Sequence, residues 1–167
     1  MKIKQLIATA LLVASMGLAQ AADKPAAAKS TDDNMIGLTT ENGKVVYNFI
    51  NEWWNEKKGA AVWEKYVSRE NYENHAVYSA KKGVHPSFDE EVAAEVKIAN
   101  ASTTRFEIKQ LVSQGSLVFA HIHAIPKEGL GRQLVMILRV RNGKITDHWD
   151  IHEALKEDSV VFDNLNR

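Results

Sequence analysis

The chain contains no cysteine. No disulfide can therefore stabilise it, even in an oxidising compartment that would permit one, and a hydrophobic core must hold it together. It also lacks internal repeats, and no segment after residue 21 resembles a membrane span. About 130 residues remain for a folded region, which is the size of one domain.

An excess of charge of one sign is also absent. Basic and acidic side chains each number 21. Removal of residues 1–21 would take away Lys2 and Lys4 and no acid, leaving 19 basic and 21 acidic side chains and a net charge of −2. Because a near-neutral surface attracts neither nucleic acid nor an anionic membrane, we expect neither as the main partner.

The first 21 residues have the pattern of a secretory signal peptide. Lys2 and Lys4 are followed by an apolar run over residues 6–18 and by an Ala-Gln-Ala cleavage pattern at residues 19–21. The run is shorter than the roughly 20 residues of a membrane span, which favours cleavage over an uncleaved anchor. We therefore predict a periplasmic or secreted protein that has no membrane attachment after cleavage.

The next segment, residues 22–39, is rich in alanine, lysine, serine and aspartate. Such a composition buries too little apolar surface to offset the entropy of ordering, and it predicts a flexible tail. The folded domain is expected to span residues 40–167.

Hydrophobic periodicity divides this domain into a helical and a strand half. Helical spacing predicts helices over about residues 42–58 and 62–67, and the capping box of Ser87 and Glu90 predicts a third that runs towards residue 100. Alternation from residue 104 to 114 predicts a strand with Phe106 and Val112 on one face, and further strands are expected over residues 117–125, 132–141 and 144–152. Helices followed by an antiparallel meander indicate an α+β domain whose curved sheet encloses a pocket.

Two predicted strands carry closely spaced histidines. Because strand side chains alternate, His121 and His123 share one face of their strand, and His148, Asp150 and His152 share one face of theirs. Neighbouring strands could thus direct imidazole and carboxylate groups to one place. The alternative is a solvated polar face without a chemical role, which is ordinary on half-buried sheets.

The turn at Asn142-Gly143 decides which way His148 and Asp150 point. A two-residue type I′ turn would pair His148 with Ile137 and set it on the face opposite to Met136 and Leu138. A three-residue loop with Gly143 in a bulge would shift the register by one residue and set it on the same face as Met136. The sequence permits both arrangements.

His121 and His123 also invite a metal interpretation. Imidazoles two residues apart on a strand can both ligate Zn²⁺, with His148 as a third ligand. Gly115, His121, His123 and Glu128 imitate the first half of a cupin metal motif, but the second half does not follow. A zinc-dependent hydrolase or lyase is therefore retained as a less favoured hypothesis.

Three segments of the C-terminal half resemble a known family. Residues 117–123 (LVFAHIH), 137–145 (ILRVRNGKI) and 147–150 (DHWD) resemble the SnoaL-like polyketide cyclase group of the nuclear-transport-factor-like superfamily. Upstream, residues 72–75 (YENH) resemble the family's Tyr-x-Gln-His-Asn-Pro segment, with His75 on its histidine. The likeness covers about residues 66–153. Ala76 and Val77 replace the family's Asn-Pro, and Met136 stands where many members have an acid.

This resemblance implies a cone-shaped, curved antiparallel sheet covered by N-terminal helices. It also implies a pocket in which related enzymes, such as ketosteroid isomerase and scytalone dehydratase, perform acid/base chemistry on carbonyl compounds without a metal or another cofactor. Such chemistry needs a base near an acidic carbon proton and a donor to the developing oxyanion. The site residues that it implies are a catalytic set, Asp150 as base with His148, His121 and His123 as donors or shuttles, and a ligand-binding set, His75, Tyr72, Met136 and Leu138.

Three functions follow as hypotheses. The first is an exported domain that binds a small organic molecule and catalyses an isomerisation, an aldol-type cyclisation or a dehydration. The second is a non-catalytic module that holds a ligand or dimerises through its sheet, and we expect a homodimer with Trp149 and Ile151 in the core or the contact. The third is the zinc enzyme.

Overall fold

The computed structural model describes residues 33–76 and 86–162. The predicted signal peptide and residues 22–32 of the predicted tail lie outside these residues. Within the described ranges, the helices are too short or too polar to cross a membrane. The elements are η1 (Asp33–Thr39), α1 (Glu41–Ile50), η2 (Asn51–Asn55), α2 (Ala60–Tyr66), β1 (Glu73–Asn74), α3 (Phe88–Ala101), β2 (Arg105–Gln114), β3 (Leu117–Ile125), β4 (Arg132–Arg141) and β5 (Lys144–Ala154).

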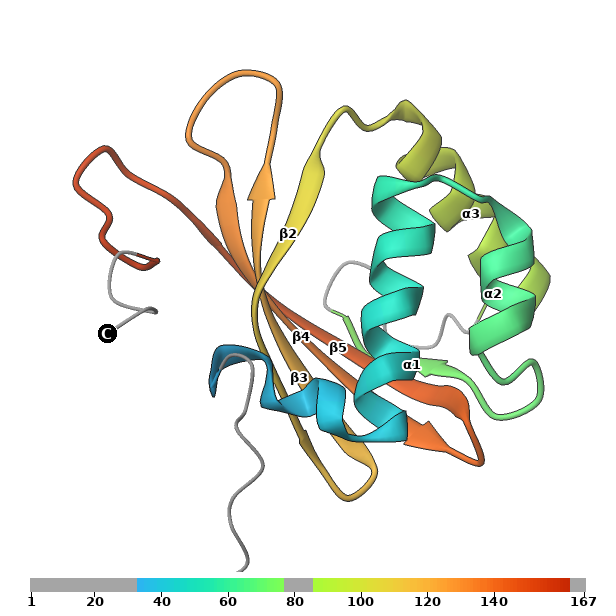
Figure 1. Cartoon of the computed structure of the whole chain (residues 1–167). Helices are drawn as coiled ribbons and strands as arrows, with labels where there is room; N and C mark the ends of the chain where they lie inside the picture. The colour runs from blue at the N-terminus through green and yellow to red at the C-terminus, as the bar shows by residue number, and fades with distance from the viewer. Residues whose placement is uncertain (1–32, 77–85, 163–167) are drawn as a thin grey trace, which may run out of the picture.

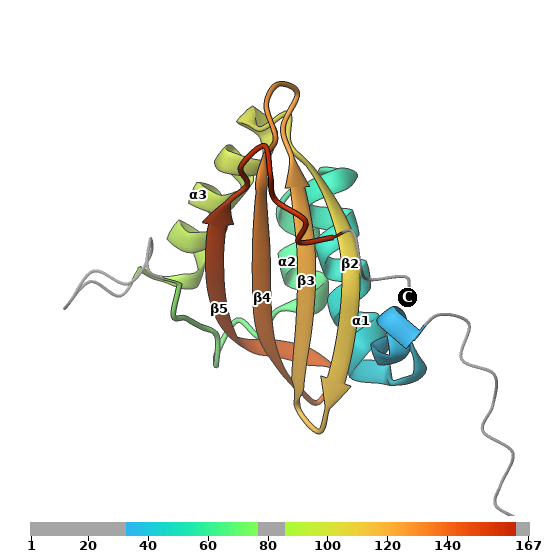
Figure 2. The same ribbon diagram turned by 90° about the vertical axis from the view of Figure 1, so that its left-hand side faces the viewer.

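One layer of helices covers one face of a curved, unclosed sheet (Figures 1 and 2). The strand order is β1-β5-β4-β3-β2, and β2 to β5 form the predicted antiparallel meander. The short β1 was not predicted, and it adds a parallel pair at the β5 edge. We call the face under α1, α2 and α3 the inner face and the opposite one the outer face. The α+β fold class is confirmed.

The first long helix ends in a wider turn. Thr40 caps α1 by accepting a hydrogen bond from the Gly43 amide at 3.0 Å, and Phe49 lies on its buried face. The helix then continues as the π-helical turn η2, which contains Trp53 and Trp54. π-turns are rare and occur often at functional sites. Here the turn buries two consecutive tryptophans against the inner face of the sheet.

The third helix begins as the sequence predicts. The Ser87 hydroxyl accepts from the Glu90 amide, and the Glu90 carboxylate accepts from the Ser87 amide at 2.9 Å. This reciprocal capping box fixes the start of α3, and it therefore fixes which side chains of α3 face the sheet.

The core lies between the helices and the inner face. Trp63 is completely buried, and it meets Phe49, Trp53 and Tyr72 edge-on at ring-centroid distances of 5.1–5.6 Å. Such edge-to-face contacts add to the hydrophobic gain from burying large rings. The sheet contributes Leu111, Ile122, Leu134, Met136, Leu138 and Ile145. The predicted cysteine-free hydrophobic core is therefore present.

Part of the predicted tail belongs to the folded domain. Residues 33–39 form η1, in which Met35 and Leu38 pack against the core. Gly37 lies so close to the backbone of Leu111 that a Cβ atom would come within 2.9 Å of the carbonyl oxygen. The prediction of a tail to residue 39 is wrong for this segment, because a few apolar side chains and one glycine allow it to dock on β2.

A β-bulge between Ile108 and Gln110 changes the facing of β2. Phe106 and Leu111 are buried on the inner face, whereas Val112 is exposed on the outer face. The predicted grouping of Val112 with Phe106 is therefore wrong, since one extra residue reverses the alternation.

The turn between β4 and β5 has two residues, as in the first of the two arrangements that the sequence permits. Asn142 and Gly143 both have positive φ, 51° and 74°, and Arg141 pairs directly with Lys144. Positive φ at both central residues is the mark of a type I′ turn.

A second feature then reverses the outcome expected for that turn. A β-bulge at Thr146 shifts the register by one residue, so that His148 pairs with Leu138 and Asp150 pairs with Met136. His148 and Asp150 therefore point to the inner face, beneath the helices. The turn matches the first alternative and the facing matches the second, because the bulge lies beyond the turn and not within it.

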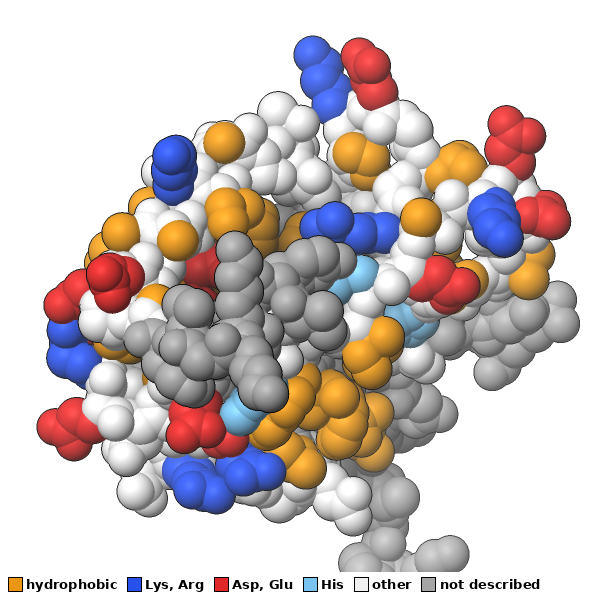
Figure 3. All heavy atoms as spheres, turned by 180° about the vertical axis from the view of Figure 1, so that it is seen from behind, with side chains coloured by type: hydrophobic (Ala, Val, Ile, Leu, Met, Phe, Trp, Pro, Cys, Tyr) orange, Lys and Arg blue, Asp and Glu red, His pale blue; other side chains and the backbone are white. Residues whose placement is uncertain are grey.

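The outer face remains partly apolar. Val112 and Phe119 are direct cross-strand partners there, and both are exposed. Ile151 of β5 is 61% exposed on the same face. Seen from behind, neighbouring hydrophobic side chains form a patch over the sheet (Figure 3).

Candidate functional site

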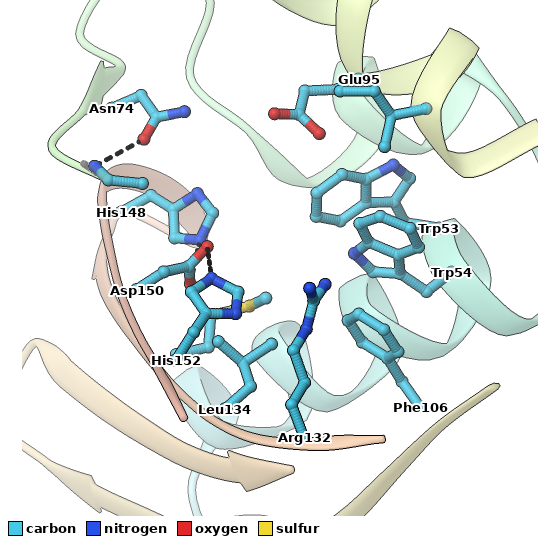
Figure 4. A pocket seen from close by; sticks show the side chains of 13 residues that line it. Trp53, Trp54, Asn74, Glu95, Phe106, Arg132, Leu134, His148, Asp150 and His152 are labelled. Carbon is cyan, nitrogen blue, oxygen red and sulfur yellow. Dashed lines mark hydrogen bonds and ion pairs between the residues drawn. The ribbon is translucent and has the colours of Figure 1, made fainter. Parts of the chain in front are cut away.

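A cavity of about 320 Å³ lies between the inner face and the helices (Figure 4). Its polar side chains come from β1, α3, β4 and β5, and its apolar ones from η2, position 76 beyond the end of β1, α3, β2 and β4. The polar set is Asn74, Glu95, Arg132, His148, Asp150 and His152, and the apolar set is Trp53, Trp54, Ala76, Ile98, Phe106, Leu134 and Met136. An apolar wall with a few converging polar groups is typical of a small-molecule site.

A row of three polar residues from β5 forms one side of the cavity. His148, Asp150 and His152 are two residues apart, so strand alternation directs all three inward. His148 Nε2 lies 2.9 Å from Asp150 Oδ1, and His152 Nε2 lies 3.6 Å from Asp150 Oδ2. Asp150 is thus held between two imidazoles while it faces the cavity.

Tyr72 supports this row from behind. Its hydroxyl lies 3.2 Å from His148 Nδ1, and His148 is only 4% exposed. Burial, together with the negative charges of nearby carboxylates, raises the pKa of Tyr72 well above its ordinary value, so Tyr72 keeps its proton. A neutral His148 satisfies both contacts when its Nδ1 accepts from Tyr72 and its Nε2–H donates to Asp150. Tyr72 therefore fixes the orientation of the His148 ring, and His148 in turn orients the carboxylate of Asp150.

Glu95 faces this row from the helical side. It projects from α3 towards the cavity, across from His148 and Asp150 (Figure 4). Burial raises the pKa of Glu95 from 4.5 to about 7, the charges of Glu91 and Asp150 add to the rise, and His148 opposes it. A carboxyl group with this pKa can donate or accept a proton near neutral pH.

Glu91 lies one helical turn before Glu95 and is buried. It accepts a hydrogen bond from the side-chain amide of Asn74, whose oxygen accepts from the Ala76 amide at 2.9 Å. These contacts tie α3 to the segment beside β5, and they hold the two sides of the cavity together.

His152 and Arg132 occupy the other end of the row. Burial lowers the pKa of His152 below its ordinary value of 6.5; Asp150 opposes this shift and the positive charge of Arg132 adds to it. His152 is therefore mainly neutral at neutral pH. The Arg132 guanidinium lies between His152 and the aromatic wall of Trp54 and Phe106 (Figure 4).

Comparison with known proteins gave matches among solved structures only. No family model matches the chain, and no curated protein matches it. A protein from Acidithiobacillus ferrooxidans described as a polyketide cyclase has a TM-score of 0.57 and 17% identity, over 70% of this chain and 90% of its own. A protein from Jannaschia sp. described as a SnoaL-like polyketide cyclase has a TM-score of 0.56 and 11% identity, over 68% of this chain and 85% of its own. The chain has a SnoaL-like fold.

An NTF2-like protein of unknown function from Cytophaga hutchinsonii extends this likeness to the wider superfamily. Its TM-score is 0.52 and its identity 12%, over 67% of this chain and 89% of its own. The predicted resemblance to the SnoaL-like group is therefore confirmed at the level of the fold.

The SnoaL-like fold brings together part of the predicted site. His148, Asp150 and Met136 line the cavity. Tyr72 does not line it but contacts His148, which does. Leu138 lies on the inner face but is fully buried in the core, and it is not among the cavity-lining residues. The structure therefore places Leu138 in the core and not at the cavity, contrary to its predicted place in the ligand-binding set.

The prediction that His121 and His123 join this site is wrong. Both lie on the outer face, because their strand neighbours Ala120, Ile122 and Ala124 take the buried positions. His121 contacts the side chains of Gln110 and Gln133 at 3.2 and 3.0 Å, and both imidazoles pack against the ring of Phe162. One sheet thus separates them from Asp150.

The zinc hypothesis fails for the same reason. His121 and His123 point away from His148, so the three imidazoles cannot ligate one ion.

His75 also departs from its predicted place. Its ring stacks on Trp149 of the outer face at 4.6 Å, and its Nε2 lies 3.4 Å from Asp147 Oδ1. With Glu73 it forms the one cluster among the described residues with the spacing of metal ligands. Arg139 lies 3.9 Å from Asp147, and its positive charge opposes a cation there.

The sequence-based reasoning missed several cavity residues. Glu91 and Glu95 are four residues apart, a spacing that sets both on one helix face, and this could have marked α3 as polar on its inner side. Trp53 and Trp54 lie within the first predicted helix, and the π-turn that presents both to the cavity leaves no sequence signal. Arg132 begins a strand, where an exposed charge is ordinary.

Proposed function

We propose that the SnoaL-like domain binds a small carbonyl compound in this cavity and catalyses proton transfer at carbon by acid/base chemistry, in an isomerisation, an aldol-type cyclisation or a dehydration. The observation that carries this proposal is the placement of two carboxyl groups, Asp150 and Glu95, on opposite sides of one apolar-walled cavity. Structural neighbours described as polyketide cyclases support this proposal.

Asp150 serves as the base in this proposal. Its carboxylate faces the cavity and is oriented by His148, which Tyr72 holds in turn. A positioned carboxylate removes a carbon proton effectively because it needs no reorientation in the transition state.

Glu95 serves as the proton donor. Its pKa of about 7 leaves a substantial fraction protonated at neutral pH, and it approaches a ligand from the side opposite to Asp150. A protonated carboxyl group can donate to the oxygen of an enolising carbonyl and stabilise the charge that develops there. Enzymes often place two carboxyl groups in different environments so that one acts as a base and the other as a proton donor, and Asp150 and Glu95 follow this pattern.

A hydrogen–deuterium exchange assay on a panel of aryl and cyclic ketones tests this function. We expect enzyme-dependent exchange of protons α to the carbonyl, followed by NMR, and a fall of 10²-fold or more, on the order of a lost general base, in Asp150→Asn. The matched control is Asp147→Asn, which removes a carboxylate from the same strand on the outer face. Wild-type protein without exchange on any ketone, or equal rates in wild type and Asp150→Asn, would contradict the catalytic role.

We propose further that this chemistry occurs outside the cytoplasm. The signal-peptide pattern of residues 1–21 supports export, and N-terminal sequencing of the mature protein should find Ala22 first.

The outer face supports a second candidate, a non-catalytic ligand-binding module that dimerises through its sheet. Val112, Phe119 and Ile151 offer exposed apolar area on that face, and patches of this kind mark interaction sites. We expect a dimer by light scattering that Ile151→Glu converts to a monomer, whereas Leu130→Glu, at an exposed loop position, leaves it intact. A monomeric wild type would exclude the dimer. Ligands that raise the melting temperature without turnover would favour this module over the enzyme.

A further inference from the structure

Arg132 is placed to bind a ligand at the open end of the cavity. It is the first residue of β4, and it shares the inner face with Leu134 and Met136. Its cross-strand neighbours are Ala124 and Ala154. Because neither alanine can fill the space beside it, the guanidinium extends into the cavity (Figure 4).

The charge of Arg132 is not matched by a carboxylate of the described residues. Arg69, Arg105 and Arg139 each form an ion pair, whereas none of the ion pairs within residues 33–76 and 86–162 includes Arg132. Arg132 is exposed and His148 is buried, so the cavity runs from a cationic open end to a buried end with the acid/base groups.

The aromatic wall beside Arg132 supplies further donors. The indole N–H groups of Trp53 and Trp54 are buried, and neither has a hydrogen-bond acceptor among the described residues. Buried donors are normally paired, and an unpaired one is costly. The indole nitrogen of Trp54 is directed towards the Arg132 side of the cavity (Figure 4). This end thus presents a cation and a neutral donor, and it calls for an acceptor-rich, negatively charged group.

We propose that the ligand of this site is a carboxylate whose aromatic or otherwise apolar body carries the reactive carbonyl. The carboxylate binds the guanidinium of Arg132, whose planar fork matches it in a bidentate manner. The body packs on Trp54, Phe106 and Leu134, and the carbonyl end reaches the space between Asp150 and Glu95. The part of this inference that concerns the reactive carbonyl rests on the proposed function. The part that concerns the carboxylate bound by Arg132 depends only on ligand binding.

Matched pairs of ligands test the anchor. Calorimetric titration with 2-naphthoate and with the neutral 2-naphthamide, and with indole-3-acetate and indole-3-acetamide, compares an anion with a neutral molecule of nearly the same shape. We expect each carboxylate to bind at least tenfold more tightly than its amide. Arg132→Gln should remove this preference and leave amide binding unchanged, and Arg132→Lys should keep part of it. The control is Arg139→Gln, on the outer face, which should behave as wild type.

Each contrary outcome is distinct. Equal binding of acid and amide by wild type, an equal loss of both in Arg132→Gln, or no binding of any carboxylate would overturn the anionic anchor. A retained carboxylate preference without ketone exchange would remove the catalytic role and leave the anchor in place. Proton exchange on neutral ketones without a preference for binding carboxylates would remove the anionic anchor and leave the catalytic role in place.

Discussion

Replacing Glu95 by glutamine is expected to lower the rate of ketone proton exchange by roughly 10²- to 10⁴-fold, the usual contribution of a general acid or base. Glutamine fills nearly the same volume and still donates a hydrogen bond, but it cannot deliver a proton. The loss therefore reports on proton transfer and not on the shape of the cavity.

The pH dependence of wild type provides the second part of this test. Because burial raises the pKa of Glu95 to about 7, its protonated form disappears as the pH rises through 7. If Glu95 is the proton donor, kcat/KM must fall over that interval, since this parameter follows the ionisation of the free enzyme. The fall should be absent in Glu95→Gln, whatever activity remains.

Two results would contradict this role. A pH profile that is the same in wild type and Glu95→Gln would assign the ionisation to another group. A rate that rises through pH 7 would make Glu95 a base and not a donor. Glu128→Gln, at an exposed loop position after β3, is the control for removal of a carboxylate from the protein.

The order of elements could be predicted because each depends on local rules. The capping box of Ser87 and Glu90, the strand limits of β3 and β4, and the Asn142-Gly143 turn are all encoded within a few residues, and the structure has them where the pattern predicts. Periodicity and turn chemistry act over such distances.

The facing of side chains could not be derived in the same way. One bulge in β2 moves Val112 to the outer face, and another at Thr146 moves His148 and Asp150 to the inner face. A bulge changes every position beyond it while it leaves little trace in composition. The bulge at Thr146 sets the facing of the catalytic residues of β5, so the strands could be predicted correctly while half of the catalytic set was not.

His121 and His123 show the limit of arguing from residue type. Their spacing is as suggestive as that of His148 and Asp150, yet the alanines and Ile122 between and beside them take the buried side of β3. Glu95 is the opposite case. Its spacing from Glu91 places both on one helix face, but this does not distinguish it from a solvent-exposed glutamate, and only the packing of α3 over the sheet makes it a partly buried acid.

The same burial of Glu95 should make its own contribution to the free energy of unfolding lower at neutral pH than at pH 4.5. Below about 4.5, Glu95 is protonated in both the folded and the unfolded chain and costs nothing. Between 4.5 and 7 the unfolded chain loses this proton while the folded protein retains it, so the free energy of unfolding falls with rising pH. Above 7 both forms are ionised and the full penalty remains, about 3 kcal/mol if each pKa unit is worth about 1.4 kcal/mol.

Glu95→Gln removes this penalty and should therefore stabilise the domain by about 2 to 3 kcal/mol at pH 8, an unusual gain for a single change, since most single mutations destabilise. At pH 4 the two proteins should differ little. Urea unfolding at both pH values measures this difference, and comparing variant with wild type cancels other titrating groups such as His152, whose lowered pKa acts in the opposite direction.

Glu128→Gln, at an exposed position, should change stability at neither pH. If Glu95→Gln were no more stable than wild type at pH 8, burial would not be destabilising the ionised form of Glu95. The raised pKa of Glu95 would then lose its physical basis. If it were both more stable and inactive, one residue would limit stability and supply the proton for catalysis, which is the trade-off expected of a partly buried acid kept for function.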